Sequence, residues 1–206
     1  AISVAVPVGE GTAERLLEKL VPRVNALRVG PSLDPESDFG PLITEAHERK
    51  VATLIDSGVA EGAELVVDGR GYRMQGFEDG FYQGPSLFDH VNRDMRIYRE
   101  EIFGPVLSIV RAPDFETALS LPDTHEYGNG VAIFTRDGGF ARDFASRVKV
   151  GMVGINVPIP VPIAYYTFGG WKRSGFGDLN QHGTDSFRFF TRAKTVTARW
   201  PGAGKG

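Results

Sequence analysis

The sequence predicts an α/β fold, with a parallel sheet held between two layers of helices. Three β-like runs, at residues 106–110, 131–134 and 152–157, alternate with amphipathic segments at residues 115–121 and 140–148. Strands that alternate with helices over short connections pair in parallel through right-handed crossovers. Because a parallel sheet is covered on both faces by such helices, we expect a three-layer domain.

The first elements expected are a strand and an amphipathic helix. Residues 2–8 alternate in the manner of a strand, which Gly9 closes. Thr12 favours the N-cap of the helix that follows, because its side-chain oxygen can accept a hydrogen bond from the first turn. Pro22 is expected to kink or restart this helix, since it lacks an N–H group. The apolar face of the helix consists of Leu16, Leu17, Leu20, Val21, Val24 and Leu27.

A second helix is predicted after a loop rich in glycine, proline and aspartate at residues 29–42. Thr44 serves as its N-cap, and the helix covers residues 45–61. Gly62 follows directly, at the position where a residue in the left-handed conformation commonly ends a helix. Both ends of this helix are therefore predicted from single residues.

Two further strands are expected before the middle of the chain, at residues 65–67 and 81–88. Residues 69–80 contain four glycines and predict an exposed loop between them. At the other end of the chain, residues 187–200 alternate over an unusual length for a strand. Since soluble proteins usually cover the edge of such a strand, we expect it to pair with a partner subunit.

Composition excludes several classes of function. The net charge of −3 and pI near 5.8 give no electrostatic reason to expect nucleic acid or an anionic membrane as a partner. No window approaches the roughly 20 apolar residues that cross a bilayer. The absence of cysteine excludes disulfides, thiolate–zinc sites and thiol catalysis within these 206 residues.

Other patterns favour ordinary structural interpretations. The four histidines have no metal-binding spacing, so we expect no metal site. Ser146 and Lys149 match the S-x-x-K spelling of serine acylases, but they lie in an amphipathic helix without the companion motifs, which favours a surface helix. Gly169 and Gly170 favour a tight loop over a phosphate cradle, because no helix is predicted after them.

The central run, residues 100–106, reads Glu-Glu-Ile-Phe-Gly-Pro-Val. Its Phe-Gly-Pro part makes a rigid turn directly before a buried strand, which fixes the place of Glu101 and Phe103. A carboxylate in this loop can accept hydrogen bonds from two ribose hydroxyls. The edge of an aromatic ring can line one side of a site for a nicotinamide ring. The chemistry alone fits many sites, including a solvent-facing acid beside a turn.

Five segments, spread over nearly the whole chain, carry a family resemblance. They are Gly40-Pro41-Leu42-Ile43, the central run, Tyr127-Gly128 with residues 131–135, Phe168-Gly169-Gly170-Trp171-Lys172-Arg173-Ser174-Gly175, and Lys194-Thr195-Val196-Thr197. In this order they resemble segments of the aldehyde dehydrogenase family. The resemblance implies that Glu101 holds the nicotinamide ribose of NAD, that Phe103 contacts the ring, and that Phe168 lines the aldehyde tunnel or packs in the core.

Residues 154–162 and 167–183 narrow the resemblance to the CoA-acylating branch, which acts on methylmalonate semialdehyde. Thr167 stands where most of the family carries proline before Phe-Gly-Gly, in agreement with that branch. The branch implies attack of a cysteine thiolate on the aldehyde, hydride transfer to NAD, and transfer of the acyl group to coenzyme A with loss of CO₂. A non-acylating aldehyde dehydrogenase of the same fold is the alternative.

The resemblance implies that this chain is the C-terminal portion of the enzyme. The catalytic cysteine is expected just before Ala1, so we expect the isolated chain to be inactive. Residues 1–184 correspond to the catalytic domain, 185–200 to an oligomerisation strand and 201–206 to a tail.

The partners implied are a small aldehyde and further copies of the chain, which would form a dimer or a tetramer. A non-catalytic assembly module is a further alternative for the function of the chain. The expected compartment is the cytoplasm or the mitochondrial matrix.

Overall fold

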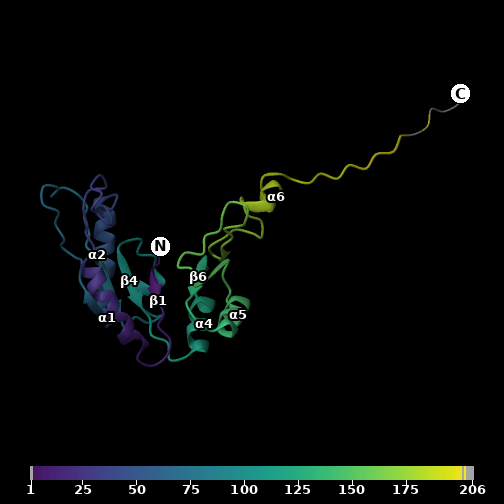
Figure 1. The fold of residues 1–206 in the computed structure, drawn as a ribbon. Helices are drawn as coiled ribbons and strands as arrows, with labels where there is room; N and C mark the ends of the chain where they lie inside the picture. Colours follow the sequence, from purple (N-terminus) through teal and green to yellow (C-terminus); the bar gives the residue numbers. More distant parts are fainter. Residues whose placement is uncertain (1, 201, 203–206) are drawn as a thin grey trace. The chain divides into compact units, whose positions relative to one another are not determined.

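The computed structural model describes residues 2–200 and 202, and it divides the chain into two compact units. The first unit is Ala1–His125 and the second is Glu126–Gly206. Each contains both helices and strands, so the predicted α/β class is confirmed at this level (Figure 1). The units are described separately below.

The first unit is built on a four-stranded mixed sheet with the order β1-β4-β3-β2. β1 pairs in parallel with β4, and β4 in parallel with β3, while β2 runs antiparallel to β3. The expectation of a purely parallel sheet is therefore wrong at one edge. The strands are β1 (Val4–Ala5), β2 (Glu64–Val67), β3 (Ser86–Asp89) and β4 (Val106–Ile109).

Helix α2 (Glu45–Ala60) has the two ends that its flanking residues predict. The side chain of Thr44 accepts a hydrogen bond from the His47 N–H group at 3.2 Å. At the other end Gly62 has a φ of 95°, and the Ala63 N–H group donates to the Gly58 carbonyl at 2.9 Å. The Gly62 N–H group also donates to the Val59 carbonyl, at 3.1 Å. These two bonds at the C-terminal end form the Schellman arrangement, which satisfies carbonyls that the helix itself leaves free.

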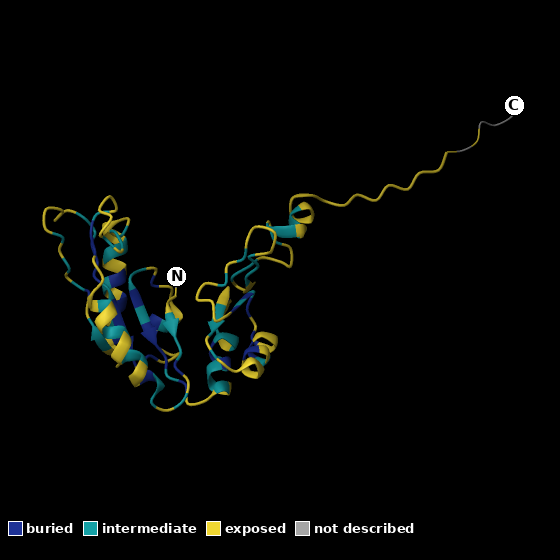
Figure 2. Ribbon diagram, viewed as in Figure 1, coloured by how far each residue is buried: buried dark blue, intermediate teal, exposed yellow. Residues whose placement is uncertain are grey.

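The core of the first unit lies between α2 and the sheet, where the buried residues of Figure 2 gather. Gly58 of α2 permits the close approach, because a Cβ atom there would lie 2.8 Å from Ile97 and 3.0 Å from Phe88. Burial of this apolar surface is the main force that holds the helix on the sheet. The cluster consists of Val51, Leu54, Ile55, Ala63, Phe88, Val91, Met95, Ile97, Ile102, Val106, Val110 and Leu121.

Helix α1 (Thr12–Asn25) differs from the prediction at Thr12, which was expected to be its N-cap, and at Pro22, where a kink or restart was expected. Its N-cap is Gly11, with a φ of 68°, and Thr12 is the first helical residue. The helix also continues through Pro22, so the expected restart is wrong. The Pro22 carbonyl still accepts a hydrogen bond from the Ala26 N–H group at 3.1 Å, because proline lacks only the donor. The first unit also contains the short α3 (Arg96–Arg99) and α4 (Phe115–Thr124), which Asp114 caps.

The second unit contains a strand–helix–strand motif. β6 (Gly130–Ile133) and β7 (Met152–Ile155) pair in parallel over four residues, and α5 (Gly138–Arg147) connects them. These elements confirm the predicted alternation. β4 pairs within the sheet of the first unit, whereas β6 and β7 pair with each other. The unit also contains β5 (Tyr127–Gly128), β8 (Trp171–Lys172) and the 3₁₀ turn Gly183–Asp185.

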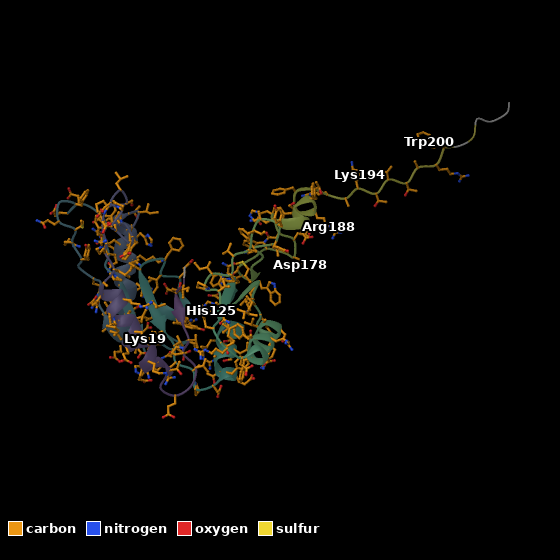
Figure 3. The ribbon with its side chains drawn as sticks, in the orientation of Figure 1. Lys19, His125, Asp178, Arg188, Lys194 and Trp200 are labelled. Carbon is orange, nitrogen blue, oxygen red and sulfur yellow. The ribbon has the colours of Figure 1, made fainter. Side chains whose placement is uncertain are left out.

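The long strand predicted at residues 187–200 is not formed among the described residues. Ser186–Phe190 is the short helix α6, and residues 191–200 are exposed and have no assigned secondary structure; Figure 3 labels Lys194 and Trp200 on this segment. A strand needs a neighbour for its backbone hydrogen bonds, whereas a helix satisfies its own. The tail predicted at residues 201–206 lies outside the described residues, apart from Gly202.

A buried ion pair joins two strands of the first unit. Asp89, at the end of β3, has a side chain only 1% exposed, and Arg111 after β4 donates to both of its oxygens, at 3.1 Å from Nε and 2.7 Å from Nη2. Burial acts to raise the pKa of the Asp89 carboxyl, yet the hydrogen bonds from Arg111 and from the His90 N–H group hold this pKa below its ordinary value. Asp89 therefore stays ionised inside the fold.

We expect Arg111→Met to lower the free energy of unfolding by about 3 kcal/mol, because it leaves a buried carboxylate without its cation. Urea denaturation at pH 7 measures the loss. Arg49→Met is the matched control, since Arg49 forms an exposed pair with Glu45 within α2 and should cost at most about 0.5 kcal/mol. Equal losses in the two variants would contradict the assignment.

The same experiment has a pH dependence with a definite sign. A carboxyl with a lowered pKa in the folded chain contributes stability that is fully present above the pKa of the unfolded chain, about 3.9. That contribution is lost as the pH falls through the folded value. The advantage of the wild type over Arg111→Met is therefore expected to be large at pH 7 and to shrink as the pH falls below about 4.

Candidate functional site

The central run forms the connection from α3 to β4, and its backbone is held at both ends. The Glu100 N–H group donates to the Arg96 carbonyl at 2.8 Å, and the Glu100 carboxylate accepts from Arg96 Nε at 2.8 Å. This hydrogen bond holds the pKa of Glu100 below its ordinary value. At the other end, the Pro105 carbonyl accepts from the Ser86 N–H group at 2.8 Å, next to the pairing of β3 with β4.

One face of α2 holds the middle of this loop. Lys50 Nζ donates to the Glu101 carbonyl at 3.0 Å, and the His47 ring lies 6.1 Å from that of Phe103 between centroids. Val51 lies against Gly104, where an added Cβ atom would be 2.7 Å from its Cγ2 atom. These three helix residues follow the i, i+3, i+4 spacing that places side chains on one face. Ile102 completes the contact, because it is buried in the core cluster.

The anchoring leaves Glu101 and Phe103 pointing away from the core, on either side of the buried Ile102. Glu101 is exposed, and its carboxylate forms no hydrogen bond or ion pair with the described residues. Phe103 is 71% exposed and has a φ of 56°. A bulky side chain rarely adopts this left-handed conformation, which is strained and often found at functional sites. The loop therefore presents an acceptor and an aromatic ring together at fixed positions.

Phe168 lies in the second unit, apart in sequence from the other two predicted site residues. It is half-buried, and its ring centroid lies 4.5 Å from that of His182. The Thr167 hydroxyl accepts a hydrogen bond from the Gly169 N–H group at 3.0 Å, which fixes the turn after Phe168. Phe168 is thus partly packed against its own unit, while part of its surface stays accessible.

Three glycines, Gly151, Gly170 and Gly175, are required by close contacts between backbones. A Cβ atom on Gly151 would lie 1.4 Å from the Gly169 carbonyl oxygen, and one on Gly170 would lie 2.4 Å from the Ser174 oxygen. Gly175 meets the Gly170 oxygen in the same way, at 2.4 Å. These contacts support the expected tight loop, in which the glycines make room for neighbouring main chain.

The S-x-x-K pattern lies on the surface as expected, but only Ser146 is in a helix, because α5 ends at Arg147, before Lys149. Ser146 lies near the end of α5, and its hydroxyl donates to the Asp143 carbonyl at 2.9 Å. Both Ser146 and Lys149 are exposed. A serine nucleophile requires an adjacent base that accepts the hydroxyl proton, whereas this hydroxyl bonds to its own helix.

Sequence reasoning missed the residues of α2 that hold the loop. His47, Lys50 and Val51 lie about fifty residues before the central run, and their types are ordinary for a helix surface. Their spacing gives the only signal, because they share one helix face with the buried Leu54. The buried face of α2 can be recognised in the sequence, but its contact with the loop at residues 100–106 cannot.

Comparisons with known proteins agree with these features. The profile of the aldehyde dehydrogenase family matches residues 3–196. A malonate-semialdehyde dehydrogenase of Pseudomonas aeruginosa is 59% identical over 201 residues, which cover 98% of this chain and 40% of that protein. A relative from Oceanobacillus iheyensis with the same description is 45% identical over 195 residues, covering 95% of this chain and 40% of its own length.

Two solved structures are also similar. A protein of Sinorhizobium meliloti 1021, assigned as a methylmalonate-semialdehyde dehydrogenase and crystallised with NAD, has 64% identity and a TM-score of 0.93. The methylmalonate-semialdehyde dehydrogenase of Oceanimonas doudoroffii has 53% identity and a TM-score of 0.92. They match 100% and 98% of this chain, and 42% of each solved chain is covered. The chain thus spans about two fifths of the length of these relatives.

The strain at Phe103 can be tested by two substitutions. We expect Phe103→Gly to be more stable than Phe103→Ala by about 1 kcal/mol, because only glycine adopts a positive φ without steric cost. Chemical denaturation of both variants measures the difference.

Phe176 is the matched control for this pair, being 98% exposed with no positive φ. There the alanine variant should be the more stable, since glycine loses more conformational freedom on folding. If the alanine variant is the more stable at position 103 as well, Phe103 is not strained.

Proposed function

The chain belongs to the aldehyde dehydrogenase family, and from this premise we propose that it forms the C-terminal part of an NAD-dependent, CoA-acylating dehydrogenase of methylmalonate or malonate semialdehyde. One structural observation carries the proposal. Glu101 and Phe103 project from a loop whose backbone is fixed by α2, and the Glu101 carboxylate has no partner among the described residues. The 59% identity with a malonate-semialdehyde dehydrogenase supports the choice of substrate.

The two exposed side chains fit the nicotinamide half of NAD. A carboxylate can accept hydrogen bonds from both hydroxyls of a ribose, and an aromatic ring offers a flat apolar surface to a nicotinamide. When bound, NAD supplies the acceptor for the hydride that leaves the aldehyde carbon. The protein's part is to keep Glu101 and Phe103 in place, which Lys50 and the buried Ile102 do through the backbone.

The nucleophile of the proposed reaction lies outside this chain, since the 206 residues contain no cysteine. A cysteine expected just before Ala1 would attack the aldehyde as a thiolate. Cysteine suits this chemistry because it forms a thioester that a second thiol, here that of coenzyme A, can take over. CO₂ is lost in the overall conversion to acyl-CoA. Phe168, with part of its surface accessible, is proposed to line the aldehyde tunnel.

The role of Glu101 is tested by comparison with its neighbour. In the complete dehydrogenase, Glu101→Gln is expected to raise the KM for NAD about tenfold, because charge-assisted hydrogen bonds are worth about 1.5–3 kcal/mol and an amide keeps part of them. Steady-state kinetics with varied NAD measure this change.

Glu100→Gln is the matched control, because the Glu100 carboxylate is already bound by Arg96. It should leave the KM for NAD within about twofold, the scale of a weak exposed pair. An equal rise in both variants would remove Glu101 from the proposed nicotinamide site.

The chain alone and the complete protein should differ in activity. The isolated 206 residues are expected to show no NAD-dependent oxidation of malonate semialdehyde, with or without coenzyme A. The complete protein should release acyl-CoA, identified by mass spectrometry, only when coenzyme A is present. Activity of the isolated chain contradicts the missing nucleophile, and free acid as the main product in the presence of coenzyme A favours a non-acylating aldehyde dehydrogenase.

A homo-oligomer, dimer or tetramer, is proposed to form through residues 187–200. Five large hydrophobic side chains of this segment are exposed in the single chain: Phe187, Phe189, Phe190, Val196 and Trp200. Pairing with another copy would cover them and supply the backbone partner that the predicted strand needs. This feature also favours the assembly module as a second candidate function.

We expect light scattering with size-exclusion chromatography to give a dimer or tetramer for the full chain and a monomer for one that ends at residue 185. The particle formed by the full chain should have about two or four times the mass of the shortened chain. A full chain that is folded and strictly monomeric would contradict both the oligomer and the assembly module.

The proposed compartment is the cytoplasm, with the mitochondrial matrix as the alternative. Among residues 2–200, no helix has the length and apolar character that crossing a bilayer demands. The compartment stays a prediction, and fractionation of cells that produce the complete protein measures it.

A further inference from the structure

Two carboxylates and one imidazole, all common metal ligands, lie together at one end of the β2–β3 pair. Glu64, the first residue of β2, lies opposite Asp89, the last residue of β3, and His90 follows Asp89 in the chain. His90 Nε2 lies 3.7 Å from Asp89 Oδ2 and 3.8 Å from Glu64 Oε2. One ligand atom of each group lies within 4.8 Å of the other two. We propose that these three residues bind a divalent transition-metal ion, with Zn²⁺ as the best fit.

The separations are close to those that a zinc ion imposes. Zinc bonds of about 2.0–2.1 Å in tetrahedral geometry place ligand atoms roughly 3.3–3.4 Å apart. The two distances from His90 Nε2 are slightly longer than this, and the Glu64 and Asp89 oxygens lie within 4.8 Å of each other. Movement of the Glu64 and His90 side chains can shorten these separations. Glu64 and His90 are 65% and 54% exposed, so that small changes of their rotamers bring both toward Asp89. Three protein ligands leave the fourth position for water.

The charge of the surroundings matches a divalent ion. Arg111 pairs with both Asp89 and Glu14, and Glu64 adds a third carboxylate to the cluster. Three carboxylates and one guanidinium leave a net charge of −2 while the imidazole is neutral. A Zn²⁺ ion bound to neutral imidazole would cancel this charge, whereas protonation of His90 alone would cancel only half of it.

Asp89 has the support that a metal-binding carboxylate commonly has. Arg111 donates to its two oxygens, and the His90 N–H group donates to Oδ1 at 2.7 Å, so that its orientation is fixed before an ion arrives. Hydrogen bonds of this kind hold ligands in place around many metal ions. Imidazole with carboxylates suits zinc and its neighbours, while Mg²⁺ prefers oxygen ligands and keeps most of its water.

The alternative to a metal site is a surface cluster in which His90, when protonated, forms ion pairs with Glu64 and Asp89. The two interpretations differ in how the chain responds to an added metal ion. A simple surface cluster neither binds Zn²⁺ nor gains stability from it, whereas the proposed site does both.

The test is isothermal titration of the tag-free 206-residue chain with ZnCl₂ at pH 7.5, after removal of metals by a chelator. We expect one ion per chain with a micromolar dissociation constant, and loss of at least about tenfold in affinity in both Glu64→Gln and His90→Gln. Zinc at saturation should also raise the melting temperature by about 5 °C, since it binds only the folded chain. A millimolar excess of MgCl₂ should not displace it.

His125→Gln and Glu18→Gln are the matched controls, because they remove one histidine and one exposed carboxylate outside the cluster. Both should bind zinc as the wild type does. Unchanged melting temperatures of the metal-free Glu64 and His90 variants show that they remain folded. Absence of zinc binding, or binding that His90→Gln leaves unaltered, overturns the proposal.

Discussion

The contact between α2 and the loop at residues 100–106 is the constraint on which the candidate site depends. Ile102 is buried in the same core cluster as Val51 and Leu54, so the loop cannot move unless the helix moves with it. Burial of apolar surface thereby fixes a backbone whose other side chains are exposed. Lys50 and Gly104 refine the contact, one by a hydrogen bond to a carbonyl and the other by the lack of a Cβ atom.

The same contact explains why two adjacent glutamates have different roles. Glu100 faces back along the short helix α3 and is bound by Arg96, whereas Glu101 is turned outward by the burial of Ile102. Only the second is left with free acceptor oxygens among the described residues. Along an extended loop the side chains alternate in direction, so a shift by one residue would exchange the two roles.

Local signals in the sequence predicted the ends of some helices, although Thr12 does not cap α1, whose N-cap is Gly11. Thr44 and Gly62 gave both ends of α2, and Asp114 gave the start of α4, because caps act within one turn. Sheet order was not predictable in this way, since the pairing of β4 with β1 and β3 depends on contacts between distant residues. The prediction of no metal site was based on histidine spacing alone, which carries no information on the strand register that places Glu64 opposite Asp89.

The pairing of β5 with β8 has a consequence for how the second unit forms during synthesis. Gly128 donates to the Ser174 hydroxyl at 3.1 Å, and Arg173 donates from its backbone to the Glu126 carbonyl at 3.1 Å, so each bond spans more than forty residues. Contacts of such sequence separation close slowly, because the entropy of the intervening loop is lost first. The ribosome must therefore release the glycine-rich segment before β5 can pair with β8. β6 and β7 need no such wait, because both precede this segment in the chain, so β5 is the strand of the second unit left open to other chains for longest.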